Sequence, residues 1–300
     1  MVRGTGTFSI GGCSHGPGPG RESNEGERGA DMEADLIYDF GMHDGRDTAF
    51  YLAKGFRVIA VEAMPDLCEQ ACERFADQIK TGALTIINRA VVDTPGPVTF
   101  YTNPQTVWGT AHRSWAHRNA SLGSPSNGEI TVDGALARDL FAEYGIPYYA
   151  KVDIEGSDRL CLEALLGFDD RPRYVSVESD KVSFRALERE FDLLERLGYS
   201  RFKVVPQHKV TDQRPPQPPA EGEWVQHTFQ GGESGLFGQE APGRWLSRHQ
   251  AVALYRLIFA RYLLVGDRIE GSAAFSAKVA RRGLRKVIGA AGWYDTHAAR

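Results

Sequence analysis

Short apolar runs alternate with amphipathic stretches from Met32 onward, in the rhythm of parallel strands joined by helices. The apolar runs predict strands at about 36–40, 57–62, 84–88, 148–153, 174–178 and 202–205, and a strand-like run at 224–229. The amphipathic stretches predict helices at about 46–54, 65–82, 134–144, from 157 onward, at 184–197 and at 251–264. The pattern therefore predicts an α/β fold whose mostly parallel sheet is flanked by helices.

One long segment interrupts the alternation. Val98–Tyr101 has the pattern of a hairpin arm, and residues 107–127 are rich in Trp, His, Ser and Gly without periodicity. A loop of this length inside a compact domain usually has a function. Residues 108–118 could cover a small-molecule acceptor, because their aromatic, cationic and hydroxyl groups suit a sugar or a polar metabolite. A solvent-facing insertion that packs its tryptophans on the sheet is the alternative.

The pattern divides the chain into three parts. Residues 1–31 are rich in Gly, Pro and charged residues, have no apolar period, and are predicted to be disordered. Residues 32–240 form the predicted catalytic domain. Residues 241–300 form a helical extension packed on or beside it, and the broad apolar face at 251–264 covers the core or forms a homodimer contact.

Composition narrows the class of protein. The 300 residues carry a net charge of −4, so nothing in the overall charge favours a nucleic-acid partner. No run reaches the roughly 18 to 20 apolar residues of a membrane span, so stable membrane insertion is not expected. The four cysteines form no C-x-x-C pair, and Cys68 and Cys72 fall on one apolar helical stripe. They are predicted to be core thiols of a reducing, cytoplasmic compartment.

Acidic residues end the first two predicted strands. Asp39 is followed by a tight turn on Gly41 and Gly45, and Glu62 ends the next strand. Such strand ends flank the crevice in which open α/β sheets bind nucleotide-like ligands, and a carboxylate can accept hydrogen bonds from ribose hydroxyls. A dinucleotide would place its pyrophosphate beside Asp39, whereas S-adenosylmethionine would place cationic groups there. The spacing also departs from G-x-G-x-x-G, and the turn therefore favours S-adenosylmethionine.

Two later strands also end in acids, Asp153 and Glu178. The sheet is therefore predicted to present four carboxylates at one edge. Because each of them must be hydrated, paired or bound to a ligand, packing alone does not account for the group.

Several blocks together resemble the FkbM-type S-adenosylmethionine-dependent methyltransferases. They are Tyr-Asp-Phe-Gly-Met-His-Asp-Gly at 38–45, Val-Ile-Ala-Val-Glu-Ala-Met-Pro at 58–65, Asn-Arg-Ala-Val at 88–91 and Lys-Val-Asp-Ile-Glu-Gly-Ser-Asp at 151–158. The resemblance covers about residues 35–205. It implies a class I methyltransferase fold: a Rossmann-like, mostly parallel seven-stranded sheet with a final antiparallel strand. It also implies methylation of a hydroxyl oxygen, without identifying the acceptor.

The resemblance implies a cofactor site for S-adenosylmethionine. Asp39, Gly41 and Gly45, with the adjacent Met42, would surround its methionine part, and Asp153 would lie near the sulfonium. Glu62, with Ala63, would bind the ribose. Residues flanking the adenine would come from the segment after the third strand: Asn88, Ala90 and Val91.

A hydroxyl nucleophile must lose its proton to a side chain within hydrogen-bond reach. The candidates are Asp153, His112 and His208, although a lone histidine is more often a surface or packing residue. The candidate acceptor-binding residues are Trp108, His112, Glu155 and Glu178. Asp153, Glu155 and Glu178 could hold a divalent ion through oxygen ligands, but the expected site contains no metal.

Three functions compete. The leading interpretation is methyl transfer to a hydroxyl of a small-molecule or sugar acceptor. The second is a protein that binds S-adenosylmethionine for other chemistry or for none. The third is an NAD-dependent oxidoreductase, which Asp39 and the glycine spacing disfavour.

Overall fold

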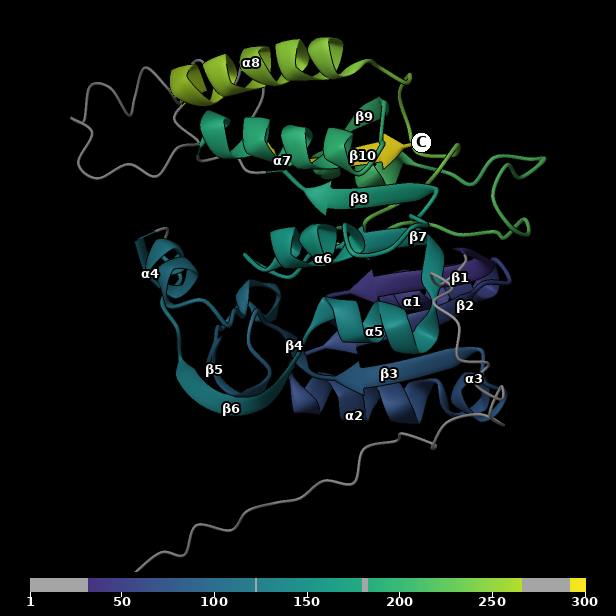
Figure 1. Ribbon diagram of the computed structural model, residues 1–300, viewed down its shortest axis with the longest axis vertical. Coiled ribbons are helices and arrows are strands. Elements are labelled where there is room, and N and C mark those ends of the chain that lie inside the picture. The colour runs from purple at the N-terminus through teal and green to yellow at the C-terminus, as the bar shows by residue number, and fades with distance from the viewer. Residues whose placement is uncertain (1–31, 122, 180–182, 266–291) are drawn as a thin grey trace, which may run out of the picture.

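The structure is a computed structural model that describes residues 32–121, 123–179, 183–265 and 292–300 (Figure 1). At its centre is a seven-stranded sheet with the order β3-β2-β1-β7-β8-β10-β9. The strands are β1 (Met32–Phe40), β2 (Arg57–Glu62), β3 (Leu84–Asn88), β7 (Ile146–Val152), β8 (Tyr174–Glu178), β9 (Arg201–Pro206) and β10 (Tyr294–Ala299). The expected class I methyltransferase fold is confirmed, because β10 alone runs antiparallel to its neighbours in this sheet.

Alternating side chains of the central strands pack on opposite faces of the sheet, as the two-residue strand period requires. Tyr38 and Phe40 contribute to the core beneath α5–α8, and Ile37 to the core beneath α1–α3. The helices are α1 (Arg46–Ala53), α2 (Pro65–Arg74), α3 (Ala76–Lys80), α5 (Ala137–Tyr144), α6 (Asp158–Leu165), α7 (Phe184–Arg196) and α8 (Arg248–Val265). Phe229 and Phe237, from an irregular segment, cover part of the second face.

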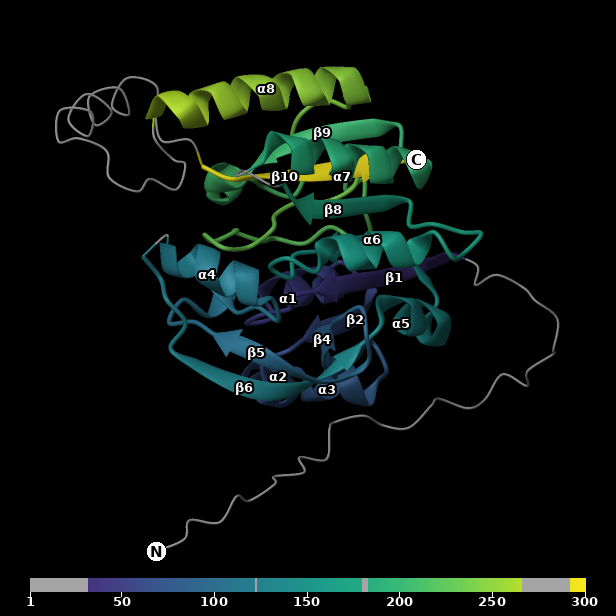
Figure 2. The same cartoon turned by 60° about the vertical axis from the view of Figure 1, so that its left-hand side comes forward.

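A smaller sheet lies beside the carboxyl ends of the central strands. It consists of β4 (Ala90–Val91), β5 (Gly96–Thr102) and β6 (Gly128–Ala135), in the order β4-β6-β5. The short helix η1 (Thr106–Trp108) and helix α4 (Arg113–Ser121) connect β5 to β6. Figures 1 and 2 both show α4, β5 and β6 at the end toward which the arrows of the parallel strands point.

The chain reverses its direction of winding at β1. It first builds outward through β2 to β3 and then returns to place β7 on the other side of β1. Open α/β sheets bind ligands in the crevice at such a switch point, outside the carboxyl ends of the strands. The topology therefore places the ends of β1, β2 and β7 around a candidate site.

The structure differs from the sequence prediction in four places, the first of which is helix α4 (Arg113–Ser121), which lies inside the segment 107–127 predicted to be a loop. The seventh strand is β10, so residues 294–299, assigned to the helical extension, belong to the sheet. The strand-like run 224–229 is irregular, because it crosses a face of the sheet, where Phe229 packs on Phe50. The helix predicted at 65–82 is broken at Phe75 into α2 and α3.

Three further predictions concern the N-terminal segment, membrane insertion and the cysteines. The segment 1–31 is not described. In the described part of the chain, no helix combines the length and the apolar character that a membrane crossing needs. Cys68 and Cys161 are free thiols, and Cys68 is buried as predicted, whereas Cys72 on the same helix is only half-buried.

Candidate functional site

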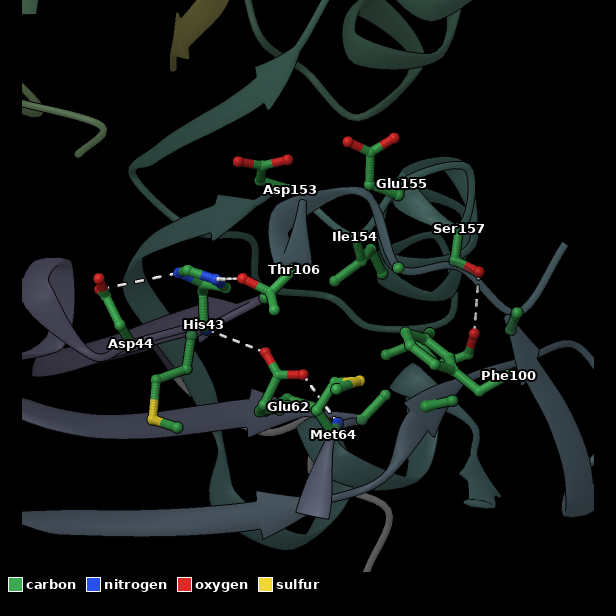
Figure 3. Close-up of a pocket in the computed structure, with 18 of the residues that line it drawn as sticks. His43, Asp44, Glu62, Met64, Phe100, Thr106, Asp153, Ile154, Glu155 and Ser157 are labelled. Atoms are coloured by element: carbon green, nitrogen blue, oxygen red, sulfur yellow. Dashed lines mark hydrogen bonds and ion pairs between the residues drawn. The ribbon is translucent and has the colours of Figure 1, made fainter. Parts of the chain in front are cut away.

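A cavity with an empty volume of about 860 Å³ opens at the switch point (Figure 3). It lies between the turn after β1, the ends of β2 and β7, and the small sheet. Of the predicted site residues, the cavity is lined by Gly41, Met42, Glu62, Ala63, Ala90, Val91, Asp153 and Glu155.

Gly41 allows β1 and β7 to end in close contact. Its φ of +82° is left-handed, and a Cβ built on it would lie 2.0 Å from the backbone oxygen of Asp153. Its amide, like that of Met42, donates to the carbonyl of Val61 in β2. The turn therefore holds the ends of three strands together, and any side chain at position 41 would separate them.

Glu62 lies on the cavity wall at the end of β2. Its Oε2 accepts a hydrogen bond from the amide of His43 at 2.9 Å, and its Oε1 accepts one from the amide of Met64 at 2.8 Å. Burial raises the pKa of Glu62, and these two amides oppose the shift. Each carboxylate oxygen has a second lone pair, so the oriented carboxylate can still accept two hydroxyl groups.

Asp39, predicted to contact the ligand, lies beneath the turn instead. It is fully buried and does not line the cavity. Its carboxylate accepts hydrogen bonds from Lys151 Nζ at 3.0 Å and Thr48 Oγ1 at 2.7 Å. Lys151 also donates to the carbonyl of Gly41 at 2.7 Å. Asp39 therefore supports the turn through Lys151, and its charge is neutralised by that partner.

Acidic groups dominate the electrostatics of the cavity. The lining acids are Asp44, Asp47, Glu62, Asp153 and Glu155. The lining cations Lys151, Arg46 and Arg89 are each paired with an acid, namely Asp39, Asp44 and Asp133. A pyrophosphate would therefore meet carboxylates and no unpaired lysine or arginine among the described lining residues, whereas a cationic ligand group would be attracted.

Asp153 and Glu155 follow β7 on the side of the cavity opposite Glu62, and Figure 3 shows both carboxylates directed away from Glu62. Asp153 is exposed, whereas Glu155 is buried and forms an ion pair with Arg118 at 3.3 Å. Burial, together with the neighbouring Glu178 and Asp153, raises the pKa of Glu155, and the charge of Arg118 opposes this shift. Asp153 is therefore the accessible carboxylate at this end of the cavity.

Besides Asp39, six predicted site residues do not line this cavity: Gly45, Asn88, Trp108, His112, Glu178 and His208. Gly45 precedes α1 against the ring of Phe75, and Asn88 holds the turn after β2 by donating to the carbonyls of Glu62 and Ala63. The carbonyl of Trp108 accepts a hydrogen bond from Asn119. These three residues have local structural roles, which the strand-end pattern could not separate from ligand contact.

The two candidate histidine bases lie outside the cavity wall. His112 Nε2 lies 2.7 Å from Ser157 Oγ, which itself donates to the carbonyl of Val91. His208 is in the short helix η2 (Gln207–Asp212), after the edge strand β9, and its ring packs against Tyr294. Neither ring faces the cavity, so Asp153 remains as the candidate base.

The sequence prediction missed residues that come from the turn after β1, from β5 and from η1. His43, Thr106 and Phe100 line the cavity. His43 Nε2 lies 2.7 Å from Thr106 Oγ1, which joins the turn after β1 to helix η1 (Figure 3). A pairing across 63 residues leaves no periodic signal, although the length of the segment 107–127 did indicate a functional loop.

No group of three or more His, Cys, Asp or Glu residues in the described ranges is arranged to hold a metal ion. Asp153, Glu155 and Glu178, the oxygen ligands considered from the sequence, are not arranged as such a group in the structure. Glu178 instead lines a second cavity, together with Arg118.

Comparison with known proteins gives one family match. Residues 39–201 match the family model of the methyltransferase FkbM domain. No curated protein matches the chain. Two solved structures are distantly similar, each over 58% of this chain with a TM-score of 0.33. One is precorrin-6y C5,15-methyltransferase from Geobacter metallireducens GS-15, at 12% identity over 68% of that chain. The other is the methyltransferase domain of bacterial CtHen1-CN, at 13% identity over 81% of that chain. Because the domain match extends over more than half of its residues, the chain belongs to the FkbM methyltransferase family.

Proposed function

We propose that the protein transfers a methyl group from S-adenosylmethionine to a hydroxyl oxygen of a small-molecule acceptor. The main support is the cavity at the switch point, where Glu62 and Asp153 lie on opposite sides. Family membership implies the donor, and the chemistry of the cavity fits it: an oriented carboxylate for a ribose, and acids for a cationic centre.

Each part of the cavity has a role in this proposal. Glu62 binds the ribose hydroxyls, and Ala90 and Val91 flank the adenine. Gly41 and Met42 contact the methionine part, while Asp39 and Lys151 hold the turn from below. Asp47 is held in the wall by the amide of Ser234 at 2.9 Å. It adds a carboxylate to the part of the wall that would receive the donor's ammonium group.

The bound donor supplies a methyl group that is already activated by the sulfonium. The protein therefore has to align the acceptor oxygen, the methyl carbon and the leaving sulfur. The acceptor hydroxyl passes its proton to Asp153 as its oxygen bonds to the methyl carbon and the carbon–sulfur bond breaks. S-adenosylhomocysteine and the methyl ether then leave, and Asp153 returns its proton to solvent.

The assigned role of Glu62 can be tested by donor binding. Glu62→Ala removes the acceptor of two hydroxyl hydrogen bonds, so we expect affinity for S-adenosylhomocysteine to fall about ten- to a hundredfold. Calorimetric titration measures this change. Glu62→Gln keeps the size, but its NH2 group cannot accept the hydrogen bond from the amide of His43 or of Met64, so it is also expected to weaken donor binding.

The control for Glu62 is Glu69→Ala, which removes an exposed carboxylate of α2 that lies outside the cavity. Thermal unfolding of each variant shows whether loss of the bonds to the amides of His43 and Met64 has also loosened the turns. Unchanged donor affinity in a folded Glu62→Ala variant would refute the ribose contact.

One observation distinguishes this proposal from an NAD-dependent oxidoreductase. Each lining lysine and arginine is paired with an acid, so the described part of the wall offers a dinucleotide pyrophosphate no unpaired arginine or lysine. Binding of S-adenosylmethionine without methyl transfer stays the second candidate, and only turnover of an acceptor separates it from the first.

A further inference from the structure

A second cavity, with an empty volume of about 840 Å³, lies beside the first. Its walls come from α4, from the turn after β7 with α6, from the end of β8 and from α7. Glu178 and Ser179 lie at its inner end, where β8 stops. Because β7 and β8 are neighbouring parallel strands, with Val152 paired to Val177, Asp153 and Glu178 occupy equivalent positions just beyond that pair.

A single turn separates the two cavities. Glu155 and Ser157 line the first cavity, whereas Gly156 and Asp158 line the second. Asp158 fixes the turn, because its carboxylate accepts hydrogen bonds from the amides of Ile154 and Gly156, both at 3.2 Å. A ligand in the second cavity would therefore lie one turn away from Asp153.

A layered contact forms the wall on the α4 side. Gly156 has a φ of +107°, and a Cβ there would lie 2.6 Å from Trp115 Nε1, so the indole rests directly on the backbone. The guanidinium of Arg118 lies 3.7 Å from the centre of the Trp115 ring. Because Gly156 and Arg118 both cover the indole, Trp115 supports Arg118 and leaves little ring surface on which a sugar could stack.

The guanidinium groups at this cavity come from three different helices. Arg118 is in α4, Arg159 in α6 and Arg189 in α7. Arg118 is paired with Glu155 at 3.3 Å, and the exposed Arg159 is paired with Glu163 within its own helix. Arg189 is exposed and has no acid partner among the described residues, so it is the guanidinium best placed to receive an anion. The acids at this cavity are Asp158, Glu178 and Glu190, of which Asp158 is already engaged by backbone amides. Arginine suits carboxylate and phosphate groups because its planar fork can donate two parallel hydrogen bonds.

We propose that the second cavity is the acceptor site and that Arg118, Arg159 and Arg189 select an acceptor that carries an anionic group, a carboxylate or a phosphate, in addition to its hydroxyl. The anion would bind at the rim formed by the three helices. The hydroxyl-bearing part would extend past Gly156 toward Asp153. This proposal rests on the proposed methyl transfer only in calling the ligand a methyl acceptor. Binding of the anion can be tested without assuming that transfer.

The test uses sets of probes that differ in one group: glucose, glucuronate and glucose 6-phosphate, and glycerol, glycerate and glycerol 3-phosphate. Each is titrated at up to millimolar concentration into the full chain, with and without S-adenosylhomocysteine, and binding is followed by calorimetry. We expect an anionic member to bind about tenfold or more tightly than its neutral counterpart, as charge-assisted hydrogen bonds imply. The comparison of carboxylate with phosphate identifies which anion the site takes.

Two variants and a control locate the effect. Arg189→Gln removes a guanidinium at the rim, and Arg118→Gln removes the one stacked on Trp115; each is expected to reduce the preference for the anion. Arg185→Gln is the matched control, because Arg185 is an exposed arginine of the same helix α7 that does not line the cavity. It is expected to keep the full preference.

Three results would overturn the proposal: no probe binds, neutral and anionic members bind equally, or the preference survives in both arginine variants. Failure of the proposed function gives a different result. In that case S-adenosylhomocysteine does not bind. The preference for anions is also measured without S-adenosylhomocysteine, and that measurement still tests the anion site.

Discussion

Lys151→Met is expected to destabilise the protein by about 3 to 5 kcal/mol, the usual cost of removing one partner of a buried ion pair. The variant leaves the carboxylate of Asp39, which has no exposed surface, with Thr48 as its remaining side-chain partner. Urea unfolding measures the change in the free energy of unfolding. The double variant Asp39→Leu with Lys151→Met removes both charges and is expected to recover part of the loss.

The control is Arg159→Gln, which breaks an exposed pair within α6. Such a pair contributes at most about 0.5 kcal/mol. A Lys151→Met variant as stable as the wild type would show that the pair does not hold the turn.

The contribution of Lys151 to stability is expected to be constant at neutral pH. Burial alone would lower the pKa of Lys151, but the carboxylates of Asp39, Asp153 and Asp47 outweigh it and raise the pKa above its usual value. A group whose pKa is raised on folding stabilises the fold fully below its unfolded pKa, which is about 10.4 for lysine. The stabilisation is lost only as the pH rises through the higher folded pKa.

Asp153→Asn is expected to reduce turnover by about a hundredfold or more, the scale of an acid–base group, with a much smaller change in donor affinity. The substitution keeps the size of the side chain and removes its ability to take a proton. Turnover is measured with an acceptor found by screening, and donor affinity by calorimetry. Asp139→Asn, at an exposed position in α5 away from the cavity, is the control.

Two outcomes would change the role assigned to Asp153. Normal turnover in Asp153→Asn would exclude it as the base, and loss of donor binding alone would place it among the donor contacts. Treatment of the wild type with EDTA separates a base from a metal ligand. We expect no effect of EDTA, because the described residues contain no cluster suited to a metal.

The pattern of apolar residues in the sequence predicts where the strands of the sheet end. Asp39, Glu62 and Asp153 follow apolar runs, and their shared edge follows from the parallel order of the strands. What each acid does there depends on partners distant in sequence. Asp39 is paired with Lys151 across 112 residues, so an acid predicted to meet the ligand supports the turn instead.

The strand β10 could not be predicted from the pattern of apolar residues. Its sequence, Tyr-Asp-Thr-His-Ala-Ala, has little apolar character, yet it lies between β8 and β9. Thr296 is fully buried, and hydrogen bonds with Ser179 and Tyr255 satisfy its hydroxyl group there. Conversely, Trp224–Phe229 has the composition of a strand, but the ring of Phe229 packs on that of Phe50 in α1, and the segment pairs with no strand that the structure describes. In both places tertiary contacts outweigh the local propensity.

Direct titration of the wild-type protein with S-adenosylmethionine, S-adenosylhomocysteine and NADH tests the central claim that the cavity at the switch point is a methyl-donor site. The acids that line it and the paired state of its lysine and arginines predict that both adenosyl compounds bind and that NADH does not. Binding of NADH, together with no heat from either adenosyl compound, would contradict the claim.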